Sequence, residues 1–314
     1  MGGGLIPSDY YMGPLINQQQ LDRVQKYNNM VKEDPEAQVL VSGVTREPGF
    51  FISPTVYKTE WRDVPYLKEE VFGPHVAIIP FDTINDAINV GVNKFFLPAI
   101  SSKYNDSMIN LKKKYNKNIF LMAGLHPCYV NKDFENEILQ VEKLIKENEI
   151  VAVGEIGIDL YWDKSNLALQ KEAFLAQIKI AQDNDLPIVI HCRESFNEIY
   201  HIIKKENLIN GIFHCFSGNL EQAKKITSLG LKLGIGGVLT FKNGGIDKFL
   251  HQINIEHIVL ETDSPYLAPT PLRGKRNESA NLIHIAKKLS EIYNIPLSEI
   301  ARITSSNSKS IFGV

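Results

Sequence analysis

The sequence predicts an α/β protein built on a TIM-type (β/α)8 barrel, with an atypical or replaced first strand and a loosely packed N-terminal segment. Three observations support this fold class. From residue 88 onward, short runs rich in β-branched residues alternate with helical patterns. Most of these runs end in His, Asp or Glu, and side chains at the C-terminal ends of parallel strands converge where the strands close into a barrel. The 314 residues are enough for one barrel of about 250 residues and a small extra segment.

The composition is that of an ordinary globular protein. Hydrophobic residues make up 44% of the chain and charged residues 22%, which argues against disorder and membrane spanning. No apolar run approaches the roughly 18 residues that a transmembrane helix needs, and no signal peptide is expected. We therefore expect a cytoplasmic protein. The net charge of -2 gives no global reason to bind nucleic acid, so any affinity for phosphate must be local to a cleft.

The first 87 residues have a different pattern from the rest. A polar helical pattern covers Gln18–Lys32, a short strand covers Gln38–Ser42, and a strand-like run covers Gly49–Tyr57. This segment contains no cluster of metal ligands or nucleophiles, and His75 is its only histidine. We expect a domain at residues 1–75 followed by a barrel at residues 76–314.

The N-terminal segment resembles part of an aldehyde dehydrogenase over residues 12 to 87, through Met12–Ile16, Gly49–Thr55 and Glu69–Pro74. In that family a glutamate and a phenylalanine of the last motif hold the nicotinamide ribose and ring, which would correspond to Glu70 and Phe72. The family's catalytic cysteine, general-base glutamate and Gly-rich nucleotide site have no counterpart here. The segment is therefore interpreted as a fragment, and no nicotinamide cofactor is expected.

The barrel elements follow in regular order. Helical patterns cover Asp106–Tyr115, Asn136–Glu147 and residues 168–184. The seven predicted strands are Lys94–Ser101, Ile119–His126, Val151–Asp159, Ile188–His191, Gly211–His214, Leu231–Gly237 and Ile258–Asp263.

An eighth strand is needed upstream of these seven. Val76–Asp82 is the only candidate, and the helical run Ile84–Val90 follows it. Pro80 weakens this stretch as an interior strand, because proline removes one ladder donor. We expect Val76–Phe81 to pair with the Phe95 strand or the Val259 strand in place of the first barrel strand.

Four residues at strand ends predict a metal site: Glu155, His191, His214 and Asp263. Charged and imidazole groups at the ends of buried strands are costly without compensation, and a divalent cation supplies that compensation. Nitrogen and oxygen ligands without a thiolate indicate Mg2+, Mn2+ or Zn2+.

The three cysteines, Cys128, Cys192 and Cys215, suit a reducing compartment. Cys192 and Cys215 each follow one of the strand-end histidines. Because side chains alternate along a strand, we expect each of these two thiols to point away from its histidine and to be buried rather than to bind a metal.

Six motifs stand in order over the second part of the chain: Gly124–Pro127, Gly154–Asp159, Ile190–Arg193, His214–Gly218, Glu261–Tyr266 and Arg273–Glu278. Through these motifs, residues 88 to 314 resemble a TatD-type metal-dependent deoxyribonuclease of the amidohydrolase-like, metal-dependent hydrolase barrel superfamily. The resemblance implies that Glu155 bridges two metals, that His191 and His214 complete one site, and that Asp263 belongs to the other and takes the proton from the attacking water. Glu155 and Asp263 are thus the implied catalytic residues.

One motif of that family is missing. Its first strand ends in a His-x-His pair that supplies two further ligands to the Asp263 side, and this sequence contains no His-x-His. Phe81-Asp82-Thr83 stands at that place, which suggests a join of the two patterns near residues 83 to 91. We expect at most one tightly held metal ion, with Asp82 as a single oxygen ligand for the vacant side.

Three further residues are candidates for substrate binding: His126, Arg193 and Arg273. Arginine offers a planar fork of donors that suits phosphate, although a salt bridge with a nearby carboxylate is the alternative for Arg193. The function hypothesis is a phosphodiester hydrolase acting on DNA, single-stranded or at an end, impaired by the missing pair. The alternative is a catalytically inactive barrel remnant that binds at most one metal or a phosphate ligand.

Overall fold

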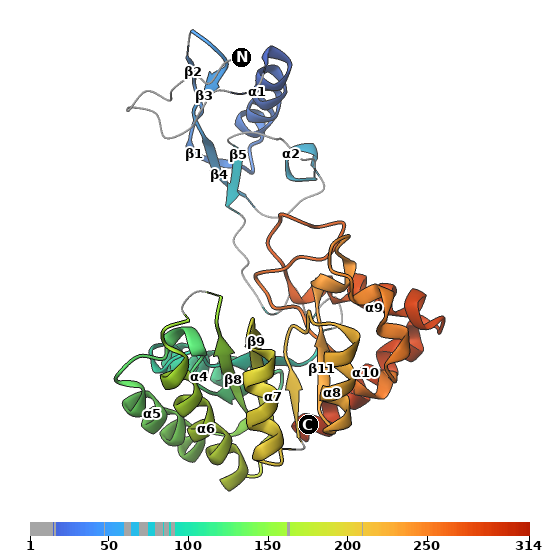
Figure 1. Cartoon of the computed structure of the whole chain (residues 1–314). Coiled ribbons are helices and arrows are strands. Elements are labelled where there is room, and N and C mark those ends of the chain that lie inside the picture. The colour runs from blue at the N-terminus through green and yellow to red at the C-terminus, as the bar shows by residue number, and fades with distance from the viewer. Residues whose placement is uncertain are drawn as a thin grey trace. The chain divides into compact units, whose positions relative to one another are not determined.

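A computed structural model of the chain describes residues 15, 17–46, 48–59, 64–68, 75–78, 84, 88, 92–161, 164–208 and 210–314. The chain divides into two compact units, residues 1–84 and residues 85–314 (Figure 1). Within the described residues, no helix has the length and apolar character needed to cross a membrane.

The first unit is a helix packed against a small sheet. Helix α1 (Gln18–Glu33) begins after Asn17, whose side chain accepts a hydrogen bond from the Gln20 backbone N–H at 2.8 Å. Strands β1 (Gln38–Val41), β4 (Thr55–Lys58) and β5 (His75–Ile78) form the sheet in that order, β2 (Thr45–Arg46) pairs with β3 (Phe51–Ile52), and α2 covers Pro65–Lys68. The unit's own core consists of Leu21, Val24, Tyr27, Val31, Ile52, Tyr57 and Tyr66.

The predicted replacement of the first barrel strand is wrong for the described residues. Val76, Ala77 and Ile78 of β5 pair in parallel with β4 of the first unit, and not with the Phe95 strand or the Val259 strand. The β4 backbone offers a ladder edge on the side opposite β1, and β5 satisfies its backbone groups there, within the same unit. Residues 79–83, 85–87 and 89–91, including Asp82, lie outside the described part of the chain.

The second unit contains one parallel sheet of seven strands, and each of the seven strands predicted from the sequence is present. The strands follow one another across the sheet in chain order, from β6 at one edge to β12 at the other, so each strand pairs with its neighbours in the sequence. This confirms the barrel class, as a seven-stranded curved sheet among the described residues. The strands are β6 (Phe95–Pro98), β7 (Ile119–Ala123), β8 (Ile150–Asp159), β9 (Ile188–Arg193), β10 (Gly211–Phe213), β11 (Lys232–Ile235) and β12 (Ile258–Leu260).

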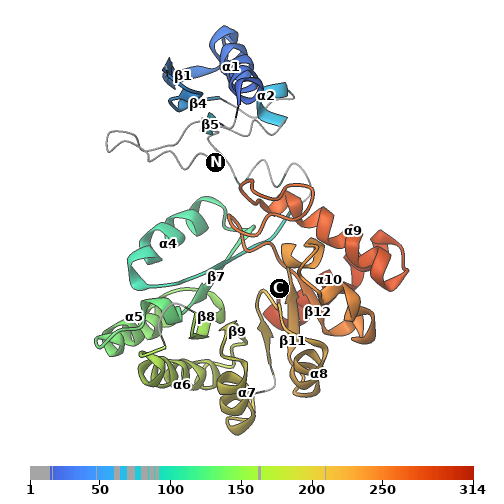
Figure 2. The same ribbon diagram turned by 45° about the horizontal axis from the view of Figure 1, so that its top comes forward.

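An α-helix lies between successive strands along the chain from β6 to β11, whereas short 3-10 helices lie between β11 and β12, and α9 and α10 follow β12. Figure 2 shows α5 to α8 following one another around the sheet in chain order. The helices are α4 (Asn105–Lys114), α5 (Phe134–Glu147), α6 (Leu167–Asp183), α7 (Phe196–Lys205), α8 (Leu220–Ser228), α9 (Leu282–Tyr293) and α10 (Leu297–Phe312).

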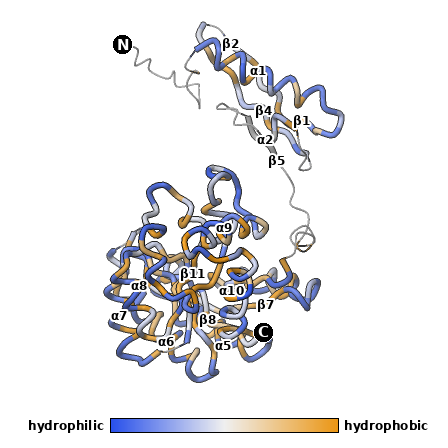
Figure 3. Tube along the Cα trace, turned by 90° about the vertical axis from the view of Figure 1, so that its right-hand side faces the viewer, coloured by the Kyte–Doolittle hydropathy of each residue, from blue (hydrophilic) through white to orange (hydrophobic). Residues whose placement is uncertain are grey.

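The core of the second unit lies between the sheet and its helices. Strand β8 is buried at nine of its ten positions, because it lies in the middle of the sheet and is covered on both faces. Phe174 and Ile178 of α6 are fully buried against it, at the helical spacing visible in the sequence. Figure 3 shows hydrophilic and hydrophobic stretches alternating along the trace of the second unit. Burial of this core holds the strand ends in fixed positions relative to one another.

Candidate metal centre

Glu155 lies inside β8, where the register between β8 and β9 shifts between Gly154 and Ile156. The shift lets the Glu155 side chain project from the sheet, and its backbone N–H donates to the Ala99 carbonyl at 3.1 Å. Residue 154 has to be a glycine, since a Cβ there would lie 2.6 Å from the Cβ of Val189. The carboxylate is 9% exposed, so it lies almost entirely within the protein.

Three imidazole rings surround one oxygen of this carboxylate. Glu155 Oε1 lies 2.8 Å from His191 Nδ1, 3.3 Å from His214 Nε2 and 3.7 Å from His126 Nε2. His191 belongs to β9, whereas His126 and His214 follow the ends of β7 and β10. His126 Nε2 also lies 3.2 Å from His191 Nδ1. Three of the four predicted ligand residues, together with His126, therefore meet at one point.

Each of two histidines has a second carboxylate on its other ring nitrogen. His191 Nε2 lies 2.9 Å from Asp159 Oδ2, and His214 Nδ1 lies 2.9 Å from Glu261 Oε2. Glu261 Oε1 also accepts a hydrogen bond from the Cys215 backbone N–H at 2.7 Å. A carboxylate on the second nitrogen fixes the tautomer and the orientation of a ligating histidine.

Asp159 and Glu261 were not assigned a role from the sequence, although both stand in the motifs that carry the resemblance. The position of each residue relative to a strand could have indicated its role. Asp159 ends β8 and is the cross-strand partner of Arg193, and Glu261 directly follows β12. Both are therefore carboxylates at the C-terminal ends of barrel strands, where catalytic residues gather.

The electrostatics of the centre are strongly coupled. Burial raises the pKa of the Glu155 carboxyl, but His214, His191 and His126 outweigh burial and lower this pKa to about 2. Burial lowers the pKa of His214, whereas Glu261 and Glu155 outweigh it and raise this pKa to about 10. Burial lowers the pKa of His126 to about 4. The three rings thus favour the ionised form of Glu155, the neighbouring carboxylates favour the protonated form of His214, and burial favours the neutral form of His126.

Asp263 lies at the edge of this cluster. Its Oδ1 is 3.6 Å from His214 Nε2, and its side chain is 30% exposed. Burial, together with Glu261 and Glu155, raises the pKa of Asp263 to about 6 against the opposing effect of His214. The residue has a left-handed backbone conformation, with φ of 54°. The fourth predicted ligand therefore borders the same histidine from the solvent side.

The two predicted arginines lie over aromatic rings. The Arg193 guanidinium is 3.9 Å from the centre of the Tyr161 ring, and the Arg273 guanidinium is 3.6 Å from the centre of the Phe241 ring. Stacking on an aromatic face holds a guanidinium in place while it remains charged. Arg273 makes no hydrogen bond or ion pair with the cluster residues that the structure describes.

The expectation for the cysteines is partly wrong. Cys192 and Cys215 are half-buried and Cys128 is exposed. Strand β10 ends at Phe213, so Cys215 lies in a turn with φ of 45°, and the alternation of a strand does not apply to it. A sulfur of Cys215, a nitrogen of His214 and an oxygen of Glu261 lie within 4.8 Å of one another.

The donor set fits a divalent metal ion. Glu155 Oε1 lies 2.8 Å from a ring nitrogen of His191 and 3.3 Å from one of His214. His126 also offers a nitrogen within 4.8 Å of the ligand atoms of Glu155 and His191. Imidazole nitrogen with carboxylate oxygen is a donor set shared by Zn2+ and Mn2+. Without an ion, Glu155 Oε1 alone would have to satisfy the three ring nitrogens that surround it. An ion would instead give each ligand atom a bond of its own.

Comparison with known proteins gives a match for each part of the chain. A family model described as TatD related DNase matches residues 75–313, and a model of the aldehyde dehydrogenase family matches residues 1–94. Similar proteins include the metal-dependent hydrolase YabD of Bacillus subtilis, 36% identical over 62% of this chain and 78% of that protein. The metal-dependent hydrolase BU355 of Buchnera aphidicola is 33% identical over 75% of this chain and 94% of that protein.

Solved structures agree with this match. The crystal structure of YJJV, a TatD homologue from Escherichia coli, has a TM-score of 0.70 and 28% identity, over 74% of this chain and 90% of that chain. A TatD-family hydrolase from Entamoeba histolytica has a TM-score of 0.63 and 26% identity, over 73% and 87% of the two chains. Through residues 75–313, this chain belongs to the TatD-related DNase family of metal-dependent hydrolases.

Proposed function

We propose that this chain is a metal-dependent deoxyribonuclease that hydrolyses phosphodiester bonds, with activity impaired by the absence of a His-x-His pair. The observation that carries the proposal is the position of Glu155 Oε1 beside the ring nitrogens of His191, His214 and His126. The match to the TatD-related DNase model supports a nucleic-acid substrate.

Glu155, His191 and His214 hold the metal in this proposal, and Asp263 borders the same position from the open side. A divalent ion at such a site lowers the pKa of water toward neutrality and screens charge on phosphoryl oxygens. Asp159 and Glu261 orient the two histidines through their second ring nitrogens.

Proton transfer and phosphate binding are assigned to side chains at the mouth of the barrel. Asp263 is the more exposed carboxylate of the cluster, so it takes the proton from the attacking water. His126, which is neutral, donates a hydrogen bond to a phosphoryl oxygen. Arg193, stacked on Tyr161, pairs with the phosphate charge at the same edge, and the basic loop that begins at Arg273 follows the nucleic-acid backbone.

The alternative is an inactive barrel remnant that binds at most one metal or a phosphate ligand. The observation that favours it is the pairing of Val76–Ile78 with β4, because that strand then brings no ligand to the barrel mouth from the described residues. The two family matches overlap over residues 75–94, and the two compact units divide within that stretch, between residues 84 and 85, which supports a chain that joins an aldehyde-dehydrogenase-like segment to a TatD-like barrel there.

The test is turnover of single-stranded DNA with added Mg2+ or Mn2+, together with the metal content of the purified protein. Glu155→Ala should abolish turnover and lower bound metal. Glu299→Ala, an exposed carboxylate paired with Arg302 on α10, is the matched control and should change neither. Metal binding without turnover in the parental protein would support the inactive remnant instead.

A further inference from the structure

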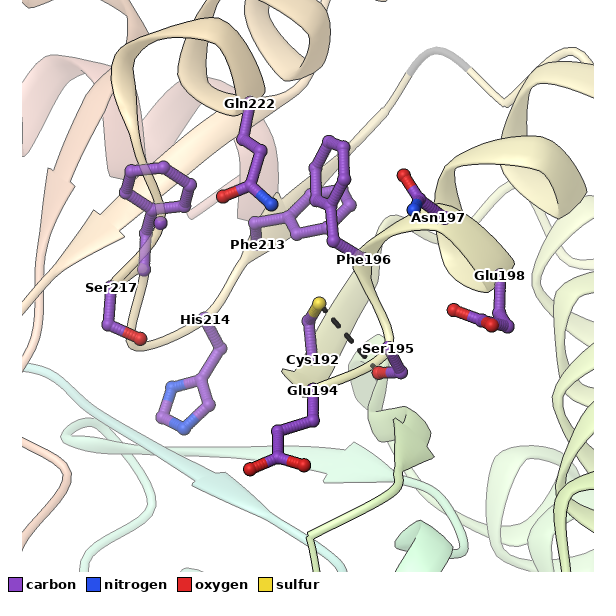
Figure 4. A pocket seen from close by; sticks show the side chains of 12 residues that line it. Cys192, Glu194, Ser195, Phe196, Asn197, Glu198, Phe213, His214, Ser217 and Gln222 are labelled. Carbon is purple, nitrogen blue, oxygen red and sulfur yellow. Dashed lines mark hydrogen bonds between the residues drawn. The ribbon is translucent and has the colours of Figure 1, made fainter. Parts of the chain in front are cut away.

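A pocket of about 430 Å³ lies beside the metal centre, between the segments that follow β9 and β10 (Figure 4). One wall comes from Cys192 and residues 194–198, at the end of β9 and the start of α7. The other comes from residues 213, 214 and 216–218 and from Gln222 of α8. This volume is in the range of pockets that take small ligands.

The pocket shares a residue with the metal centre. His214 lines the pocket, and its Nε2 lies 3.3 Å from Glu155 Oε1. Cys192, the residue after His191, also lines it, and its sulfur lies 3.9 Å from the Ser195 hydroxyl. A group attached to a phosphate at the metal centre therefore has this pocket as its neighbour.

The lining combines flat apolar surfaces with amide groups. Phe196 and Phe216 contribute aromatic faces, and Figure 4 shows the amides of Asn197 and Gln222 on either side of Phe196. Phe196 is itself held by Tyr200, with ring centres 5.7 Å apart in a stacked arrangement. An aromatic face beside amide donors and acceptors is the chemistry that binds a nucleobase, because stacking uses the π-face and the amides pair with polar edges.

Two carboxylates also line the pocket. Glu194 and Glu198 both belong to this lining, whereas none of the residues that line it is a lysine or an arginine. An anionic phosphate would be repelled there, so the uncharged part of a nucleotide is the part that fits. Carboxylates also accept hydrogen bonds from the amino groups of bases.

We infer that this pocket receives the nucleobase next to the scissile phosphate, with Phe196 as the stacking surface. This inference rests on the proposed nuclease function and adds a base-binding subsite to it. It predicts that hydrolysis depends on a base at that position and not only on the sugar-phosphate backbone.

The first test compares a short single-stranded oligodeoxynucleotide with the same backbone carrying abasic sites. The parental protein should show a higher kcat/KM on the intact strand. Phe196→Leu keeps an apolar side chain but removes the flat face, and should lower the ratio of the two kcat/KM values about tenfold. Tyr115→Leu, a half-buried aromatic residue after α4, is the matched control and should leave the ratio unchanged.

Asn197→Ala is a second variant at an exposed position of the lining, in case Phe196→Leu does not fold. It should lower the ratio in the same direction. Equal kcat/KM on intact and abasic strands in the parental protein would overturn the inference. A ratio unchanged in both variants would also overturn it.

A binding measurement separates this inference from the proposed function. Deoxyadenosine and deoxycytidine are titrated into the full chain and followed by saturation-transfer NMR, with deoxyribose as the base-free reference. Nucleoside binding that is lost in Phe196→Leu and kept in Tyr115→Leu supports the subsite, even if no DNA is cut. Hydrolysis of DNA without nucleoside binding would leave the nuclease proposal standing and overturn the subsite.

Discussion

Replacing Glu261 with glutamine tests whether the carboxylates behind the histidines control metal binding. In the parental protein Glu261 Oε2 accepts the proton of His214 Nδ1 at 2.9 Å, so Nε2, on the side of Glu155, is the nitrogen that can bind a metal once its own proton is released. In Glu261→Gln, the side-chain oxygen continues to accept from the Cys215 N–H, so the amide nitrogen faces Nδ1. An amide donates to that nitrogen, and the ring proton then moves to Nε2, where it competes with the metal.

The size of the effect follows from the contacts that change. One charge-assisted hydrogen bond of 2.9 Å is lost, and such bonds contribute about 1.5–3 kcal/mol. The bond from the Cys215 N–H is kept, so it adds nothing to the loss. Each 1.4 kcal/mol corresponds to about a tenfold change in affinity. We therefore expect the metal Kd to rise about 10- to 100-fold, the range found for lost partners of ligating histidines.

The assay is equilibrium dialysis or calorimetric titration of the metal-free protein with Mn2+ and Zn2+. Glu299→Gln, on the exposed face of α10, is the control and should leave the Kd unchanged. A Kd for Glu261→Gln within about threefold of the parental value would refute the reasoning, since it is well below the tenfold change expected.

A pair of glycine variants tests the contact between Glu261 and His214 from β11, the strand between β10 and β12. A Cβ on Gly234 of β11 would lie 2.5 Å from Glu261 Oε2, whereas a Cβ on Gly236 would lie no closer than 3.5 Å to Glu261 Oε1. Gly234→Ala should therefore displace the carboxylate and weaken metal binding. Gly236→Ala should not, and equal effects from the two variants would argue against this account.

Three further outcomes are expected. The purified protein should hold at most one tightly bound metal ion per chain, because the Asp263 side lacks a His-x-His pair; two equivalents by mass spectrometry after dialysis would contradict this. Metal binding at pH 8 should release protons, and the affinity for the metal should rise as the pH rises toward 10. Glu261, Glu155 and Asp263 raise the pKa of His214 to about 10, and only the neutral ring binds a metal. Binding heats that are the same in buffers of different ionisation enthalpy would contradict this prediction. Limited proteolysis should cut within residues 1–74 before it cuts the barrel, because the core formed by the described residues of the first unit has seven buried hydrophobic side chains. Equal rates in both parts would show that the N-terminal segment is well packed.

The sequence determined the order of the barrel elements and most of the metal centre. Each of the seven strands is a local pattern of apolar, β-branched residues, and a neighbour along the chain becomes a neighbour in the sheet, so the pattern is enough to place the strand ends. Glu155, His191 and His214 could be grouped because each was expected at the end of a predicted strand, although β8 and β9 continue past Glu155 and His191 in the structure. Their meeting at one carboxylate oxygen follows from the curvature of a parallel sheet.

The tertiary structure decided what local patterns leave open. The local pattern of His75–Ile78 predicts a strand that could belong to either unit. Its position depended on which sheet edge was available to it, and in the structure it pairs with β4. Asp159 and Glu261 became partners of histidines only through side-chain directions set by the sheet, at 2.9 Å each: Asp159 and His191 lie on the neighbouring strands β8 and β9, whereas Glu261 and His214 follow β12 and β10, with β11 between them. Hydrogen bonds of this kind depend on distance and angle between residues far apart in the chain, so the sequence shows the groups but not their pairing.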